Sequence, residues 1–309
     1  MNRRLLRAAV ITPLLLVASA PGITDMTDAD IRAGWLEHAA RAQLHRWYQV
    51  YERPAGGIDN ALDILAEDVV VNSGLGTATG HDEYASRVAQ LPATWRNSHV
   101  VESSIVEVGD GERLTLTADV TYRNAGMLES GAVRVAGLDY VMEMRKGDAT
   151  LPLLTRVEIG QREDGETETF ADAYAENRLL SLVHYYLALI EDPARDPEPM
   201  RELLGPDFSL NFSSGAITSF DDFSAWLAGP GSQVTASTHL IENFSHETLD
   251  EDRHYRLSVD FDWSGILPDG TTMVARTRHV WTVINDVTER FARIENVDVE
   301  VLEPFRAAD

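Results

Sequence analysis

Apolar and polar positions along the chain predict a long amphipathic helix at the start of its ordered part. Between residues 31 and 51 apolar side chains recur every three or four positions, as on one face of a helix. This stripe consists of Leu36, Ala40, Leu44, Trp47 and Tyr51. Pro54 follows it, and a residue without a backbone N–H ends a helix. We predict that the helix ends there and that shorter helices follow near 59–66 and from Asp82.

The rest of the first half alternates between apolar and polar residues, which is typical of strands with one buried face. From Leu114 to Arg123 the alternation is regular, and Gly-containing turns lead to a predicted strand at 133–144. Arg156 opens the last predicted strand, and a short one covers 69–72. Helices followed by an antiparallel sheet indicate an α+β fold.

The whole pattern occurs twice, because residues of the same type recur 139 positions apart without a gap. The matching pairs include His45 and His184, Glu52 and Glu191, Asp68 and Asp207, Asn72 and Asn211, and Gly76 and Gly215. A period of this length indicates a duplicated domain rather than a solenoid, whose repeats run about 20–50 residues. We predict a first copy at 28–160, an acidic connector at 161–169 and a second copy at 170–309.

The amino-acid composition excludes several classes of binding partner and of catalytic or metal site. The chain has 50 acidic and 26 basic residues and a formal charge of −24, which argues against nucleic acid as a partner. It has no Cys, which excludes disulfides, thiolate nucleophiles and Cys-based metal sites. We find neither His, Asp and Glu at metal-ligand spacing nor a Gly-rich phosphate loop, and predict no metal and no cofactor.

The first 22 residues read as a secretory signal peptide. Arg3, Arg4 and Arg7 precede an apolar run from Ala8 to Val17, which is too short to span a membrane. Small residues at 18–20 resemble a cleavage site. We expect a periplasmic or secreted protein that does not contact the membrane after cleavage. A cytoplasmic protein that starts at Met26 is the alternative.

The order of elements in each copy, together with the spacing of Leu65, Asp68 and Asn72, resembles the nuclear transport factor 2-like (SnoaL-like) superfamily. The resemblance implies two tandem cone-shaped domains, each a curved antiparallel sheet wrapped around its helices, with a pocket at the wide end. Ketosteroid isomerase chemistry is incomplete, since Ser73 and Phe212 stand where that enzyme has its base. Scytalone dehydratase is the better match.

The resemblance to the dehydratase implies catalytic residues in both copies. They are Tyr51, Glu52, His99 and Asp139 in the first copy, and Glu191 and His239 in the second. A neutral His can move a proton between carbon and a leaving hydroxyl when a carboxylate orients its ring. We also predict that a ligand contacts Trp47, Asn72, Tyr140, Tyr186, Asn211 and His279.

Two kinds of function remain open. The first is a cofactor-independent lyase or isomerase, dehydratase-like, that acts on a small, largely apolar oxygenated molecule of polyketide or steroid type. The second is a ligand-binding or interaction module without turnover, in which Glu52 and His99 are structural. In either case we expect a monomer whose two copies form an intramolecular pseudo-dimer. Such a pair would mimic the homodimer common in the family, sheet against sheet, but the sequence does not settle whether the two sheets face each other.

The signal-peptide interpretation predicts the N-terminus of the native protein. Edman sequencing or mass spectrometry should find a chain that begins between residues 21 and 26, and fractionation should find it outside the cytoplasm. A native chain that retains Met1 would contradict the interpretation.

Overall fold

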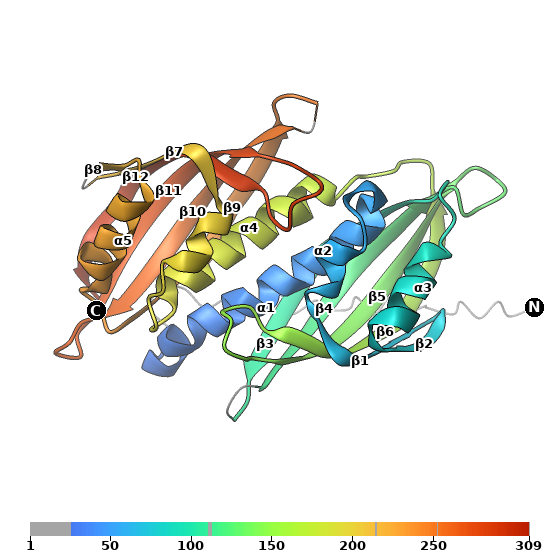
Figure 1. Ribbon diagram of the computed structural model, residues 1–309, viewed down its shortest axis with the longest axis horizontal. Coiled ribbons are helices and arrows are strands. Elements are labelled where there is room, and N and C mark those ends of the chain that lie inside the picture. Colours follow the sequence, from blue (N-terminus) through green and yellow to red (C-terminus); the bar gives the residue numbers. More distant parts are fainter. Residues whose placement is uncertain (1–25, 111–112, 214, 252, 309) are drawn as a thin grey trace, which may run out of the picture.

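The computed structural model describes residues 26–110, 113–213, 215–251 and 253–308 (Figure 1). The predicted signal peptide at 1–22 lies outside these residues. The ordered part begins with a capped helix, because the Thr27 hydroxyl accepts a hydrogen bond from the Asp30 backbone N–H. The Asp30 carboxylate accepts the Thr27 N–H in return, so both ends of this capping box are made.

The first copy contains the predicted elements in the predicted order. They are α1 (Asp28–Glu52), η2 (Pro54–Gly56), α2 (Asp59–Leu62), β1 (Leu65–Ser73), β2 (Gly76–Thr79), α3 (Gly80–Ala89), β3 (Arg96–Val108), β4 (Arg113–Ala125), β5 (Val133–Arg145) and β6 (Leu153–Thr167). The long helix, the helix near Asp82 and the alternating strands are confirmed, whereas the short helix predicted near 59–66 ends at Leu62 because β1 begins at Leu65. The short strand β2 occupies part of the turn expected after β1.

The second copy repeats this order. Its elements are α4 (Tyr174–Glu191), η3 (Glu198–Glu202), β7 (Leu204–Phe212), β8 (Gly215–Ile217), α5 (Phe220–Ala228), η4 (Pro230–Ser232), β9 (Ala236–Thr248), β10 (His254–Ile266), β11 (Thr272–Ile284) and β12 (Arg293–Ala307). Two six-stranded sheets, each with helices packed on one face, confirm two tandem α+β cones.

Both sheets are mixed rather than purely antiparallel. The strand orders are β2-β1-β6-β5-β4-β3 and β8-β7-β12-β11-β10-β9. The pairs β1–β6 and β7–β12 are parallel, and the other pairs are antiparallel. In each copy the last strand lies inside the sheet, between the first strand and the preceding one, and it runs parallel to the first.

The two copies meet mainly through their first helices, and α1 also contacts β9 and β10 of the second sheet. In Figure 1, α1 and α4 lie side by side in the centre, and the sheets lie on the two outer sides. The helices are antiparallel, since Asn177 near the start of α4 contacts Glu52 at the end of α1, and His184 farther along α4 contacts His38 nearer the start of α1. The orientation that the sequence left open is thus settled: the two sheets do not face each other, because both helices lie between them.

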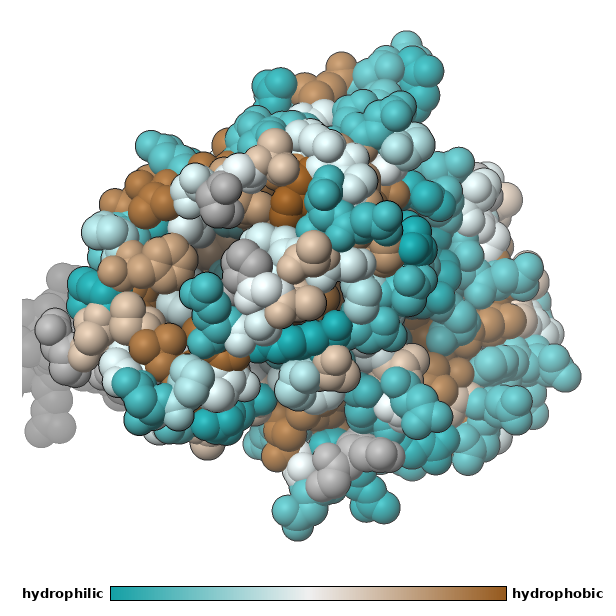
Figure 2. Space-filling model, turned by 60° about the vertical axis from the view of Figure 1, so that its left-hand side comes forward, coloured by the Kyte–Doolittle hydropathy of each residue, from teal (hydrophilic) through white to brown (hydrophobic). Residues whose placement is uncertain are grey.

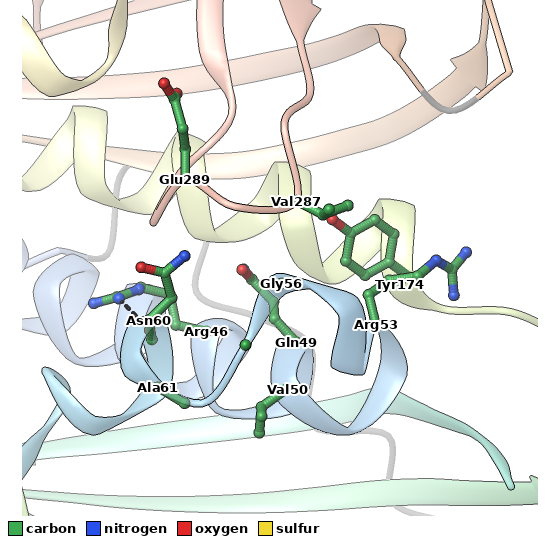
Figure 3. Close-up of a pocket in the computed structure, with 11 residues that line it drawn as sticks. Arg46, Gln49, Val50, Arg53, Gly56, Asn60, Ala61, Tyr174, Val287 and Glu289 are labelled. Carbon is green, nitrogen blue, oxygen red and sulfur yellow. Dashed lines mark hydrogen bonds between the residues drawn. The ribbon is translucent and has the colours of Figure 1, made fainter. Parts of the chain in front are cut away.

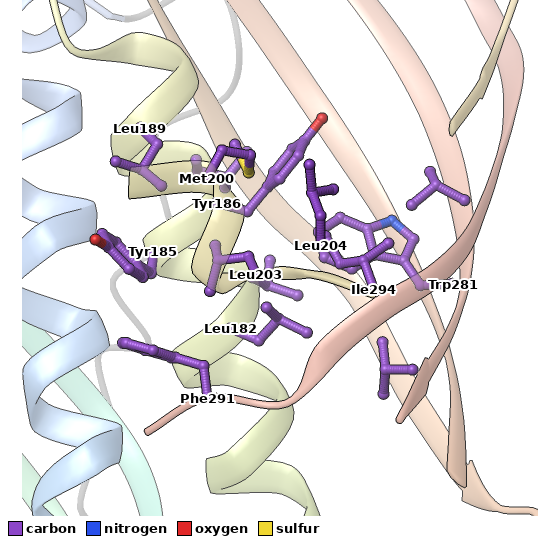
Figure 4. Close-up of a cluster of buried hydrophobic side chains, with 14 of the residues drawn as sticks. Leu182, Tyr185, Tyr186, Leu189, Met200, Leu203, Leu204, Trp281, Phe291 and Ile294 are labelled. Carbon is purple, nitrogen blue, oxygen red and sulfur yellow. The ribbon is translucent and has the colours of Figure 1, made fainter. Parts of the chain in front are cut away.

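The hydrophobic core of the second copy extends through α4 into α1. Tyr186, Trp281 and Ile294 fill the space between α4 and its sheet (Figure 4). On the other side of α4, Tyr185 packs against Phe291 with ring centroids 4.7 Å apart, and Ala39 and Ala42 of α1 join the same cluster. The small side chains of α1 let the helix backbones approach closely.

The predicted connector at 161–169 is mostly strand. β6 continues to Thr167 and pairs with β5, so the chain between the last strand of one copy and the first helix of the next covers 168–173. Residues 160–166 of β6 are exposed on both faces of the strand. Because no apolar alternation marks a strand without a buried face, the sequence pattern could not reveal this one.

The surface is mostly polar, and its apolar patches are small and separate on the face shown in Figure 2. Phe305 and Leu249 are among the exposed large apolar side chains of the second copy. Within the described residues, no helix combines the length and the apolar character needed to cross a membrane.

The close approach of α1 to the second copy can be tested at Gly34. A Cβ at this position would lie 2.0 Å from Thr238 Oγ1 on β9, which forces the interface apart. We expect Gly34→Ala to lower the free energy of unfolding by about 1–3 kcal/mol in urea titrations. Gly74→Ala is the matched control, since no atom lies within 4 Å of its new Cβ. Equal stability of the two variants would contradict the close packing.

Candidate functional site

The structure brings Glu52 and His99 together. Glu52 is the last residue of α1, and His99 lies near the start of β3. Glu52 Oε1 accepts the backbone N–H of His99 at 2.8 Å and lies 3.3 Å from His99 Nδ1. Both residues are 5% exposed. The carboxylate therefore holds the strand and the imidazole at the same time.

The second copy repeats this pair. Glu191 ends α4, and its Oε1 lies 2.7 Å from Nδ1 of His239 on β9. Glu191 is also 5% exposed, and its side chain is fully buried. The carboxylate and histidine matched on the sequence thus form a contact in both copies.

An aromatic cluster surrounds His99 on the inner face of the first sheet. The Tyr48 ring stacks on the imidazole with centroids 4.6 Å apart, and the Tyr51 ring lies at 5.9 Å. The Tyr51 and Tyr84 hydroxyls form a hydrogen bond of 2.7 Å. Two further predicted ligand contacts belong to this cluster, since Trp47 packs on Tyr51 and Tyr140 on Tyr48. Tyr48 and Tyr84 were not predicted from the sequence.

The equivalent region of the second copy is also aromatic. His239 lies edge-on to Phe261 with centroids 5.4 Å apart, and Phe261 contacts His279 at 4.7 Å. Tyr186 packs on Trp281 deeper in the same core. His279 Nδ1 is buried without a hydrogen-bond partner among the described residues, and burial lowers the pKa of His279 to about 3.

Three predicted site residues lie on the outer face of their sheets. Asp139 bonds Arg162 at 3.0 Å and pairs in register with Asp119. Its side chain points away from His99, because successive strand residues face opposite sides and its neighbour Tyr140 faces inward. Asn72 donates to Glu158, and Asn211 donates to Asn296 and Asp298. The structure does not bring these three residues to the Glu–His pairs.

A residue of the opposite copy contacts each Glu–His pair. Asn177 of α4 donates to Glu52 Oε1 and Oε2 at 3.1 and 3.2 Å, and to the His99 carbonyl at 2.8 Å. His38 of α1 lies 3.0 Å from the His239 carbonyl through Nε2 and 3.7 Å from Glu191 Oε1. Sequence reasoning missed both residues, although they are themselves 139 positions apart.

Two further histidines link these contacts across the interface. Asn177 Oδ1 lies 2.8 Å from His45 Nδ1, and His38 Nδ1 lies 2.9 Å from His184 Nδ1. The His45 and His184 rings stack with centroids 5.8 Å apart. A continuous row of buried polar side chains therefore runs from one Glu–His pair to the other. We call it the interface row: His99, Glu52, Asn177, His45, His184, His38, Glu191 and His239.

Two cavities lie away from the Glu–His pairs. The first, at the junction of the copies (Figure 3), has a volume of about 20 Å³, enough for one water molecule. Arg46, Gln49, Tyr174 and Glu289 line it, and Arg46 hydrogen-bonds the Asn60 carbonyl there. The second, of about 440 Å³, is a groove on the outer face of the first sheet near Arg123 and Gly165. Among the described residues, no group of three or more His, Asp or Glu could hold a metal ion.

Comparison with solved structures finds proteins of which almost the whole length matches a little under half of this chain. No family model and no curated protein matches it. A hexachlorocyclohexane dehydrochlorinase from Novosphingobium barchaimii is 13% identical, covers 46% of this chain and 96% of its own, and has a TM-score of 0.40. A putative scytalone dehydratase from Novosphingobium aromaticivorans is 15% identical, with 47% and 95% coverage and a TM-score of 0.39. A nuclear transport factor 2-like protein from Salmonella enterica is 14% identical, with 42% and 93% coverage and a TM-score of 0.38.

Each copy has the same architecture, with helices packed on one face of a six-stranded mixed sheet. The two tandem α+β copies that the predicted resemblance implies are confirmed. Within this fold the Glu–His pair sits where the first helix ends against the strand β3 or β9, beside the inner face of the cone.

Burial sets the charge of the interface row. It lowers the pKa of His38 to about 3 and of His45 to about 4, so both rings are neutral at neutral pH. Burial also lowers the pKa of His184 and His239 and raises that of Glu52 and Glu191. Hydrogen bonds from His99 and Asn177 partly oppose the upward shift at Glu52.

The neutral state of His45 predicts a pH dependence of stability. Unfolded His takes up a proton below pH 6.5, whereas folded His45 stays neutral down to about pH 4, so acid favours the unfolded state. His45→Gln removes this titration and can still donate to Asn177. We expect the variant to gain about 2 kcal/mol relative to wild type between pH 7.5 and pH 5. Urea titrations at the two pH values test this, and parallel pH profiles would contradict it.

Proposed function

We propose that the first copy is a cofactor-independent acid–base lyase or isomerase, dehydratase-like, for a small, largely apolar oxygenated molecule. The observation that carries the proposal is the orientation of His99. Its Nδ1 faces the Glu52 carboxylate, and no described residue hydrogen-bonds its Nε2. With Glu52 ionised, the proton sits on Nδ1 and the lone pair on Nε2, which suits a base.

The chemistry follows from these positions. His99 Nε2 takes a proton from a carbon next to a carbonyl, and Glu52 stabilises the imidazolium that forms. The same proton then returns to a β-hydroxyl, which leaves as water while the carbon–carbon double bond forms. In an isomerase the proton returns instead to another carbon. No redox partner is needed in either case.

The tyrosine pair supplies the donor for the substrate oxygen. One of the two hydroxyls donates its hydrogen to the other in the Tyr51–Tyr84 hydrogen bond. The accepting hydroxyl keeps its own hydrogen, which it can donate to a substrate oxygen. Burial raises the pKa of both hydroxyls, so they remain protonated. A neutral donor of this kind polarises a carbonyl and stabilises the enolate that forms on proton removal.

The second candidate function is a binding or interaction module without turnover. The observation that favours it is the cover over His99, whose side chain is 6% exposed beneath the stacked Tyr48 ring. Catalysis then requires the aromatic cluster to open so that the substrate reaches His99. A binding module can hold its ligand elsewhere in the cone without contact to His99. Export to the periplasm or the exterior and a monomeric state are compatible with both functions.

Substitutions in the first copy distinguish the two functions. We expect His99→Ala and Glu52→Gln each to lower turnover by a factor of roughly 10²–10⁴, and the double variant to lose little more, because the pair acts as one unit. The assay incubates the protein with β-hydroxy-carbonyl and enone compounds and follows water loss by mass and ultraviolet absorbance.

His239→Ala is the matched control, since it removes the equivalent ring from the second copy. Full turnover in His99→Ala, with loss in His239→Ala, would move the active site to the second copy. A compound that binds the cone and is recovered unchanged from the wild-type protein would favour the binding module.

A further inference from the structure

The two copies carry different residues at one equivalent position, which contacts the Glu–His pair of the other copy. Each first helix sends one polar side chain across the interface to the pair of the other copy. The residue is Asn177 on α4 and His38 on α1. The two copies are therefore not equivalent at the carboxylates that orient their histidines.

Asn177 is held in one orientation. Its Oδ1 accepts the Nδ1 proton of His45 at 2.8 Å, so its amide group must point at Glu52. The two N–H groups are then shared between the Glu52 carboxylate and the His99 carbonyl. An amide is neutral and always a donor, and a carboxylate that accepts such bonds favours its ionised form.

His38 cannot do the same for Glu191. The His239 carbonyl is an acceptor, so His38 Nε2 must donate to it. A neutral ring has one N–H, and His38 Nδ1 then accepts from His184. No N–H of His38 remains for Glu191, whose Oε1 is 3.7 Å from its Nε2.

We propose that Asn177 is a positioning residue, supplied by the second copy to the site of the first, that holds the Glu52 carboxylate toward His99. His38 occupies the equivalent position and gives Glu191 no such donor. This inference rests on the proposed function for its catalytic meaning: the first copy has the competent base, and the second copy completes it.

Other groups around the two carboxylates are accounted for. Glu52 faces His99 from β3, and Tyr48 of α1 and Tyr140 of β5 lie close enough to interact with it. Glu191 faces His239 from β9 and His38 from α1. Burial and the charge of Glu37 raise the pKa of Glu191, whereas hydrogen bonds from the Thr238 hydroxyl and the His239 backbone N–H oppose that shift. The two carboxylates therefore differ in the source of their side-chain donor: Glu52 has the amide of Asn177 from the opposite copy, and Glu191 has the Thr238 hydroxyl from its own copy.

The experiment measures the two carboxylates directly by ¹³C NMR of glutamate Cδ over a pH series of the full chain. Glu52→Gln and Glu191→Gln assign the two signals. In wild type we expect Glu52 to titrate at lower pH than Glu191. Asn177→Leu should raise the Glu52 midpoint by about one pH unit and leave Glu191 unchanged, since a lost donor destabilises the charged form.

The reciprocal variant His38→Asn gives the test a second arm. It should provide Glu191 with an amide donor and lower its midpoint by a similar amount, which keeps the test decisive where Asn177→Leu fails to fold. Gln49→Ala is the control, since Gln49 bonds Ser181 and Arg178 in the same interface without touching either pair. Midpoints unchanged in both Asn177→Leu and His38→Asn would overturn the inference.

The experiments distinguish a failure of the proposed lyase activity from a failure of the proposed role of Asn177. Shifts of the predicted sign, with no turnover on the β-hydroxy-carbonyl panel, would support the role of Asn177 and count against the lyase. Turnover that depends on His99, with an acid limb of kcat/KM unmoved by Asn177→Leu, would overturn the role of Asn177 and leave the lyase standing.

Discussion

The packing of α1 against α4 is the contact on which the rest of the structure depends. Each helix is buried twice, once against the sheet of its own copy and once against the other helix. Burial of apolar surface supplies the free energy, and the small residues of α1, such as Gly34 and Ala42, allow the close approach. Because the ends of these helices carry Glu52 and Glu191, the same interface that joins the copies also positions both carboxylates.

The interface row places polar side chains in a buried interface, and these side chains orient both carboxylates. A buried polar group destabilises the fold unless it has a hydrogen-bond partner, so side chains placed in this interface must satisfy one another. His45 orients Asn177, and Asn177 orients Glu52, although the three come from both copies. An amide does not relay protons, so the two Glu–His pairs influence each other through position and polarity rather than through proton transfer. A single copy would leave its own carboxylate without that support.

The sequence predicted most of the fold but only part of the candidate site. The repeat and the apolar periodicity predicted the helices and the strands, and the resemblance to the dehydratase implied the pairing of Glu52 with His99. The same periodicity could not show which faces join, although Leu182, Tyr185 and Leu189 make α4 apolar beyond one stripe, the signal of a helix buried on two sides. Asp139 and Tyr140 were assigned to one pocket even though neighbours on a strand face opposite sides, and this contradiction was visible in the sequence. The role of Asn177 could not be predicted from the sequence. A polar residue in an apolar helix has a role that depends on its partner on another helix, and the sequence does not show which residues meet there.

The central claim is that the two copies form one structural unit through α1 and α4. Differential scanning calorimetry of the full chain tests it most directly, because domains that share a large buried interface unfold together. The account predicts a single transition whose calorimetric enthalpy equals its van't Hoff enthalpy. Two separate transitions, each with about half of the total enthalpy, would show that the copies fold independently and would contradict it.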